Sequence, residues 1–216
     1  MLKNKNFIDL SNRMPAVFDQ GRFSTCTANA VSTALQFTKR LSHRPSRMFS
    51  YWAGRKQVGT QKVDGGVHIS DVLDGMNKKG WVSERVYGYE SENLNRRPDL
   101  KTFKDAAKRK GRISYFTPNR SEQVLENLLL SGKPVIAAIR VFPQLYELKD
   151  EVLRFDQNLT SESGHAVLIT GFDDATKTFS FRNSWGTNWG NQGYGKVSYE
   201  FVLDGYSTYD LKVIDG

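Results

Sequence analysis

The stretch Gln20-Gly-Arg-Phe-Ser-Thr-Cys-Thr-Ala-Asn-Ala30 contains the only cysteine of this 216-residue chain, Cys26. Two further motifs follow far downstream, Gly164-His-Ala-Val167 and Asn183-Ser-Trp-Gly-Thr-Asn-Trp-Gly190. A thiol, a histidine and an asparagine that are distant in sequence can form a Cys-His-Asn nucleophilic site once the chain is folded. This constellation predicts an enzyme, and more specifically a peptidase.

The residues around Cys26 favour a helix that begins at the thiol. Ser24 or Thr25 can cap it, and small and apolar residues recur at helical spacing as far as Leu41. A helix N-terminus carries partial positive charge, which favours thiolate over thiol, and a nearby imidazolium favours it further. Taken alone, one cysteine would indicate only a small buried hydrophobic residue. The distant histidine and asparagine are what favour a nucleophile.

His165 is the predicted general base because it begins an apolar segment that reads as a buried strand. It would take the thiol proton and later protonate the leaving amine. Asn183 comes after the next strand of a hairpin, so its side-chain oxygen can bond the second ring nitrogen and set the tautomer. Trp185 could cover that hydrogen bond and exclude water. His43 and His68 compete for the role, but neither is followed by an Asn-Ser-Trp on the next strand.

Gln20 gains significance from its place before the expected helix. Its side-chain amide and the backbone N–H of Cys26 can both donate to an oxygen that becomes negative when a thiolate attacks a carbonyl. Donors placed in this way form an oxyanion hole. The sequence therefore predicts catalysis by Cys26, His165, Asn183 and Gln20.

The first half of the chain reads as helical and the second half as strands. Further helices are expected over 45–52, 69–80, 99–110 and 121–130, and strands over 134–142, 165–171, 178–182, 194–203 and 209–214. The stretch 143–164 is predicted to be a surface loop near the site. The result is an α+β fold in a single catalytic unit, residues 1–216. A helical lobe (about 20–110) and a sheet lobe (about 111–216) would hold the site in a cleft between them.

The composition is that of a globular protein, with 38% hydrophobic and 25% charged residues. No apolar run approaches the ~20 residues that a membrane span needs, and the N-terminus lacks a signal-like segment. We therefore expect neither membrane insertion nor secretion. A single cysteine cannot form a disulfide within the chain, which fits a reducing compartment.

The net charge of +8 is concentrated in a run of eight basic residues between 96 and 112. Such a run can bind nucleic acid or another polyanion, but a solvated helix face is the preferred interpretation, since no nucleic-acid-binding module is visible. One cysteine and three histidines without CxxC or HExxH spacing argue against zinc. We expect no metal and no cofactor. The run comprises Arg96, Arg97, Lys101, Lys104, Lys108, Arg109, Lys110 and Arg112.

Seven short motifs resemble, in type and in order, those of the papain-like cysteine peptidases. They are Asp19-Gln-Gly21, Ser24-Thr-Cys26, Gly65-Gly66, Gly164-His-Ala-Val167, Gly171-Phe-Asp173, Asn183-Ser-Trp-Gly186 and Gly190-Asn-Gln-Gly-Tyr194. The resemblance implies Cys26 on the helical lobe, with His165 and Asn183 on the sheet lobe. It also implies that Gly65 and Gly66 offer backbone hydrogen bonds to an extended peptide. Residues implied to line the substrate site are Val67, His68, Ser163, Gly164, Ala166 and Trp185.

Two departures from the family pattern have consequences. The family usually has a cysteine three residues before the nucleophile, in a disulfide, and here that position is Phe23; Thr27 replaces the aromatic residue after the nucleophile. In this the chain resembles the disulfide-free members found in microbes and large viruses. Loss of the disulfide fits an intracellular setting, in the cytoplasm or packaged in a viral particle. We also expect a monomer.

The leading hypothesis is a thiol endopeptidase that cleaves polypeptides through an acyl-enzyme. The first alternative is an exopeptidase, isopeptidase or acyl transferase on the same site, with the 143–164 loop blocking one end of the cleft. The second is a non-catalytic binder with a basic surface. Control of activity stays open between a removed prosegment, a proteinaceous inhibitor and neither.

Overall fold

A computed structural model describes residues 6–156, 158, 160–161 and 163–216. The chain divides into two compact units. A sheet unit contains residues 6–19 and 117–213, and a helical unit contains residues 20–116 and 214–216. The helices of one unit and the mostly antiparallel sheet of the other make this the α+β fold that the sequence predicts.

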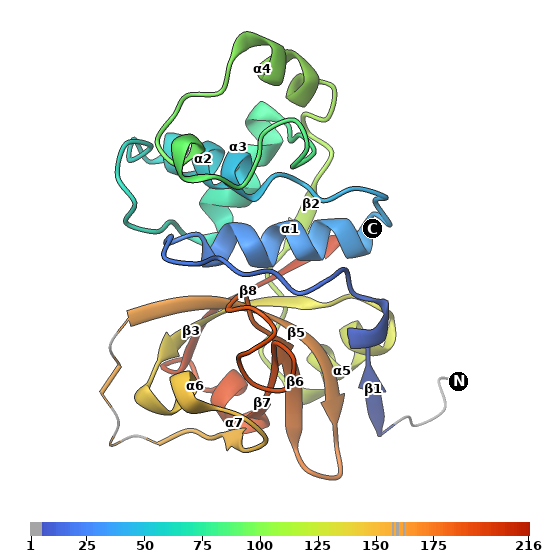
Figure 1. Cartoon of the computed structure of the whole chain (residues 1–216). Coiled ribbons are helices and arrows are strands. Elements are labelled where there is room, and N and C mark those ends of the chain that lie inside the picture. The colour runs from blue at the N-terminus through green and yellow to red at the C-terminus, as the bar shows by residue number, and fades with distance from the viewer. Residues whose placement is uncertain (1–5, 157, 159, 162) are drawn as a thin grey trace. The chain divides into compact units, whose positions relative to one another are not determined.

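The helical unit contains α1 (Cys26–Thr38), α2 (Arg47–Gln57), α3 (Ile69–Lys79), α4 (Leu100–Ala107) and the short strand β2 (Ser114–Phe116), with a 3-10 turn at Ser91–Asn93 (Figure 1). Local signals explain the helix starts. Ser46 accepts a hydrogen bond from the backbone N–H of Phe49 at 3.0 Å, and Asp99 accepts one from Thr102 at 2.7 Å. Each is an N-cap that satisfies a donor of the first turn.

Two expectations about α1 need correction. The helix ends at Thr38, not at Leu41, and Arg40 just beyond it has a left-handed backbone (φ 49°). Thr25 is the N-cap residue but makes no side-chain cap bond. Its hydroxyl instead lies 2.5 Å from that of Tyr89 and accepts from the Asn29 amide. A tertiary partner has replaced the local cap.

Helices α2 and α3 pack so closely that the contact needs a glycine. A Cβ on Gly75 would lie 2.5 Å from the backbone carbonyl of Ala53. Beside this contact a core forms from apolar residues of α2, α4 and the segments that join them. These residues are Met48, Phe49, Trp52, Ala53, Val82, Tyr87 and Ala106.

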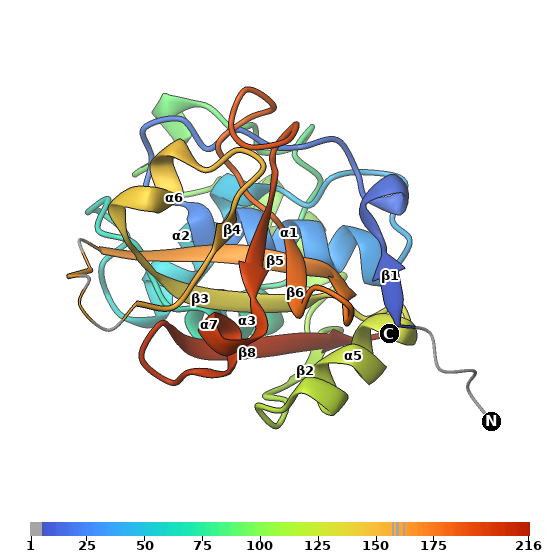
Figure 2. The ribbon, with the colours of Figure 1, turned by 90° about the horizontal axis from the view of Figure 1, so that it is seen from below.

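The sheet unit contains β1 (Phe7–Asp9), α5 (Glu122–Leu130), β3 (Val135–Val141), α6 (Pro143–Glu147), β4 (Val152–Leu153), β5 (Ser163–Asp173), β6 (Thr178–Arg182), β7 (Tyr194–Ser198), α7 (Tyr199–Leu203) and β8 (Thr208–Asp215). The strand order is β8-β3-β5-β6-β7-β4. All pairings in this series are antiparallel except that of β4 with β7. Figure 2 shows β3 between β5 and β8.

Strand β5 is the longest and is paired on both edges. Beyond the end of β3, strand β1 continues the edge of β5 by pairing Asp9 with Gly171. A Cβ on Gly171 would lie 2.4 Å from the carbonyl oxygen of Ile8, so this close approach needs glycine. The long, doubly paired strand gives His165 a rigid base.

Three expectations for the second half change in detail. The predicted strand 194–203 stops at Ser198, whose hydroxyl accepts from the N–H of Phe201 and caps α7. The predicted loop 143–164 contains α6 and β4, while residues 157, 159 and 162 of that stretch lie outside the described residues. Strands β1 and β2 were not expected, and each is only three residues long.

Candidate active site

Cys26 is the first residue of α1, as the sequence predicts, and it is half-buried. The first backbone N–H groups of an α-helix have no carbonyl partner within the helix, and the helix dipole adds partial positive charge there. Both effects favour the thiolate of Cys26 over the thiol. The N-terminus of α1 therefore holds the thiol where a larger fraction of it is thiolate, which is the nucleophilic form.

Gln20 is largely buried in the same unit, and its side chain is held in place. Its Nε2 donates to the carbonyl oxygen of Phe23 at 2.8 Å. Its own backbone carbonyl accepts from the hydroxyl of Tyr89 at 2.9 Å. The Gln20 amide is thus oriented by the segment that leads into Cys26.

The Gly65-Gly66 strip lies in the loop that precedes α3. The backbone N–H of Gly66 donates to the hydroxyl oxygen of Tyr51 at 3.0 Å. Val67 is half-buried, while His68 is exposed and is the N-cap residue of α3 without a side-chain cap bond. The Gly66 N–H is therefore occupied within this unit by Tyr51.

The sheet unit brings His165 and Asn183 together. His165 lies in β5 opposite Ile139 of β3, and Asn183 follows the last residue of β6. Nε2 of His165 lies 2.7 Å from Oδ1 of Asn183, and both residues are buried. The backbone N–H of Ser184 also donates to that oxygen at 2.8 Å. An amide oxygen can only accept, so the His165 proton is on Nε2, and Nδ1 is the nitrogen that accepts a proton.

Burial determines the charge state of His165 in this unit. Removal from water lowers the pKa of its imidazole to about 4, and the hydrogen bond to Asn183 opposes the shift. The ring is therefore neutral at pH 7. A neutral ring with a fixed tautomer can act as a general base.

Aromatic rings cover the histidine. The ring of Trp185 lies 4.7 Å from that of His165, and Tyr146 of α6 stacks on Trp185 at 5.4 Å with nearly parallel planes. The rings of Tyr146 and Trp185 also border a hollow of about 680 Å³. No sequence motif marks Tyr146, and its only signal is its place in the 143–164 stretch, which was predicted to lie near the site.

The remaining candidates of the sheet unit lie at the start of β5. Ser163 and Gly164 are exposed, whereas Ala166 is buried next to His165. The helical unit thus holds one half of the predicted constellation and the sheet unit holds the other. The first half comprises Gln20, Cys26, Gly65, Gly66, Val67 and His68, and the second comprises Ser163, Gly164, His165, Ala166, Asn183 and Trp185.

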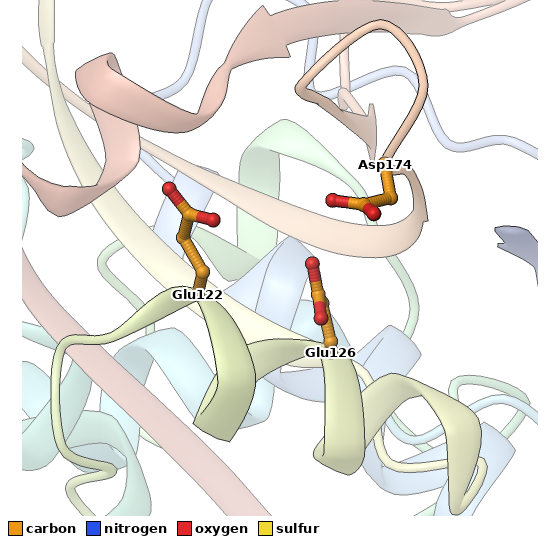
Figure 3. Close-up of side chains that lie close together, drawn as sticks. All are labelled: Glu122, Glu126 and Asp174. Atoms are coloured by element: carbon orange, nitrogen blue, oxygen red, sulfur yellow. The ribbon is translucent and has the colours of Figure 1, made fainter. Parts of the chain in front are cut away.

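An acidic cluster on the sheet unit has the spacing of a metal site. Figure 3 shows Glu122 and Glu126 on α5 facing Asp174 in the β5–β6 turn, with one oxygen of each within 4.8 Å of the others. The ammonium of Lys177 donates to Glu122 at 3.2 Å and to Asp174 at 2.6 Å, and the hydroxyl of Tyr199 donates to Glu126 at 2.9 Å. A lysine thus compensates the negative charge, and we assign no metal to this cluster.

Part of the basic run is paired locally. Asp105 binds both Lys108, at 3.2 Å, and Arg109, at 3.1 Å, and the guanidinium of Arg109 also lies 4.9 Å from the ring centre of Trp81.

Among the described residues, no helix is both long and apolar enough to cross a membrane.

Comparisons with known proteins identify the family. The family model for papain family cysteine proteases matches residues 11–204. The chain is 29% identical over 212 residues to an uncharacterized peptidase C1-like protein of Acanthamoeba polyphaga mimivirus, covering 91% of this chain and 68% of that protein. It is 27% identical over 192 residues to a viral cathepsin of Rachiplusia ou multiple nucleopolyhedrovirus, covering 86% of this chain and 56% of the cathepsin.

Solved structures agree with the sequence comparisons. Xylellain, a cysteine protease from Xylella fastidiosa, superposes with a TM-score of 0.88 at 30% identity, covering 98% of this chain and 86% of xylellain. A Carica candamarcensis cysteine protease in complex with E-64 shares the fold alone, with a TM-score of 0.68 at 17% identity and 98% coverage of both chains. The chain therefore belongs to the papain family of cysteine proteases.

Proposed function

We propose that this protein hydrolyses peptide bonds through a covalent acyl-enzyme on Cys26, with His165 as general base and general acid. The observation that carries the proposal is the 2.7 Å bond between His165 Nε2 and Asn183 Oδ1. It leaves Nδ1 as the basic nitrogen of a buried, neutral ring. The proposal requires this nitrogen and the Cys26 sulfur to act on the same substrate.

The first half of the reaction forms a thioester. Nδ1 of His165 takes the thiol proton, and the thiolate attacks the carbonyl carbon of the scissile peptide. The side-chain amide of Gln20 and the backbone N–H of Cys26 donate to the resulting oxyanion. When the C–N bond breaks, the amine takes the proton back from Nδ1 of His165 and leaves.

The second half regenerates the thiol. His165 removes a proton from a water molecule, which attacks the thioester carbonyl through the same oxyanion hole. The C–S bond breaks, the acid product departs, and the leaving sulfur takes the proton back from Nδ1 of His165, which restores the thiol and the neutral ring. Asn183 does not touch substrate in either half, because its role is to hold the ring in one tautomer.

Polypeptides are the proposed substrates. Val67 and Ala166 would make the pocket beside the nucleophile partly apolar, and the Gly66 carbonyl would bind substrate backbone. E-64 is bound to one structural neighbour, which supports sensitivity of this site to the same class of thiol-directed inhibitor. Viral relatives and a lone cysteine support an intracellular or particle-associated setting.

A bifunctional reagent tests the proposed pair of Cys26 and His165. 1,3-Dibromoacetone should alkylate Cys26 with one arm and His165 with the other, so that the reagent loses both bromines. The cross-link should abolish peptide hydrolysis, and peptide mapping should locate it at these two residues. Cys26→Ser should take up no cross-link, and His165→Ala should be alkylated at Cys26 alone. Modification of Cys26 with full retention of peptide hydrolysis would refute the mechanism.

A further inference from the structure

The carboxylate of Asp64 binds a backbone N–H forty residues away. The N–H of Ser24, two residues before the nucleophile, lies 3.1 Å from Oδ1 and 3.2 Å from Oδ2 of Asp64. The hydroxyl of Ser24 also donates to the Asp64 carbonyl at 3.2 Å. Charge-assisted bonds of this kind are stronger than neutral ones. The segment before Cys26 is therefore joined directly to the loop that carries Gly65 and Gly66.

Tyr51 of α2 connects the same carboxylate to the glycine strip. Its hydroxyl donates to Asp64 Oδ1 at 2.6 Å and accepts from the Gly66 N–H at 3.0 Å. Tyr51 is fully buried, and this burial, together with the bond to Asp64, raises the pKa of its hydroxyl. The hydroxyl therefore remains protonated and continues to donate to Asp64 near neutral pH.

Arg55, one helical turn further along α2, contacts both Tyr51 and the loop that carries Asp64. Its guanidinium carbon lies 3.9 Å from the ring centre of Tyr51, and Nη1 donates to the Val63 carbonyl at 2.7 Å. Arg55 is completely buried, which lowers the pKa of its guanidinium, while the neighbouring Asp64 acts in the opposite direction. A buried arginine with fixed partners makes this side of the loop rigid.

We propose that Asp64 is a positioning residue: with Tyr51 it sets the distance between the segment before the nucleophile and the peptide-binding glycine strip. Phe23 occupies the position where the family usually has a disulfide cysteine. In this chain the hydrogen bonds between the adjacent Ser24 and Asp64 connect the same segment to the loop without a covalent bond. The inference rests on the proposed function, because it assumes that the strip of Gly65 and Gly66 binds substrate.

The test compares two substrates that differ only in whether they reach the strip. One is an N-acyl dipeptide coumarin amide, and the other is the N-acyl single-residue coumarin amide with the same scissile residue. The quantity compared is kcat/KM for the dipeptide substrate divided by kcat/KM for the single-residue substrate. Asp64→Ala and Tyr51→Phe should lower this ratio by about 10- to 100-fold, the size expected when a reacting group is misplaced by about 1 Å. Alkylation of Cys26 by iodoacetamide should stay within a few-fold of wild type.

Two further variants separate positioning from folding. Asp64→Asn keeps an oxygen that can accept from Tyr51 and Ser24, so it should restore most of the ratio that Asp64→Ala loses. Tyr199→Phe is the matched control, because this buried tyrosine also donates to a carboxylate, that of Glu126, which belongs to the sheet unit and not to the Asp64 arrangement. Its ratio should be that of wild type.

The outcomes are distinguishable. If folded Asp64→Ala and Tyr51→Phe keep a ratio equal to or above wild type, the proposal is wrong, and Asp64 serves folding alone. A ratio that falls equally in Tyr199→Phe also refutes it. If the wild type hydrolyses neither substrate although Cys26 is alkylated normally, the proposed function itself fails.

Discussion

Nε2 of His165 lies 2.7 Å from Oδ1 of Asn183, and the two residues are 18 positions apart on β5 and just after β6. This bond determines which ring nitrogen holds the proton and therefore which nitrogen can take one from a thiol. The geometry explains why an asparagine suits this position: its oxygen fixes the tautomer without adding charge to a buried site.

Asn183→Ala should lower kcat roughly 10- to 100-fold, as is typical for residues that orient a functional histidine. The KM for peptide substrates should change little, because the side chain does not touch substrate. Asn183→Asp gives the contrasting result: a carboxylate beside the ring should raise the pKa of His165 and move the acid limb of the kcat/KM profile. An unchanged profile in Asn183→Asp would contradict the assigned contact.

Gln20→Ala should lower kcat by ~10²–10³-fold with little change in KM, the usual effect of removing one oxyanion donor. Gln20→Glu has the same size but cannot donate at neutral pH, so it should lose about as much. Alkylation by iodoacetamide forms no oxyanion, and its rate at Cys26 should be unaffected in Gln20→Ala. Wild-type turnover by Gln20→Glu would remove the side chain from the mechanism.

The buried His165 should make stability depend on pH. Its pKa is about 4 in the folded protein and 6.5 for an unperturbed histidine, so between these values the unfolded state binds the extra proton. The free energy of unfolding should therefore decrease as pH falls from 6.5 to 4, by up to ~1.4 kcal/mol per pH unit.

Urea titrations of Cys26→Ala, which removes any thiolate, should show this slope. In Cys26→Ala/His165→Gln the slope over the same interval should be smaller. Identical slopes in the two proteins would show that His165 titrates in the folded protein much as it does in water.

Charge reversal at Lys101, Lys104, Lys108 and Arg112 should leave kcat/KM on a short neutral peptide within a few-fold of wild type. All four residues are exposed, and Lys108 forms an ion pair with Asp105 at 3.2 Å. Any binding to heparin, measured at several salt concentrations, should weaken with a reduced salt dependence. Loss of turnover in a variant that stays folded would place this helix in the active site.

Several features could be predicted from local sequence because their causes are local. Helices α2, α4 and α5 begin after Ser46, Asp99 and Ser121, and each of these side chains accepts from an N–H three residues ahead. Strand β6 follows a tight turn in which Lys177 has a left-handed backbone (φ 51°). The short continuous apolar runs of β3 and β5 also indicated buried strands, because a strand that is covered on both faces has apolar residues at successive positions.

Other features depended on partners far along the chain. Thr25 reads as a cap but bonds Tyr89, sixty-four residues away, and the β1 strand is defined only by its pairing with β5. Tyr146 is unremarkable in sequence and gains its place by stacking on Trp185.

By itself, the sequence determined which residue is the candidate nucleophile, because there is one cysteine, and the order of the motifs that identify the family. Tertiary structure alone decided which nitrogen of His165 is basic, through Asn183, and how the segment before Cys26 is held, through Tyr51 and Asp64. The physical reason is that caps and periodicity arise from neighbours three or four residues apart. The tautomer of a buried ring and the anchoring of a loop depend instead on packing that brings distant residues within hydrogen-bond distance.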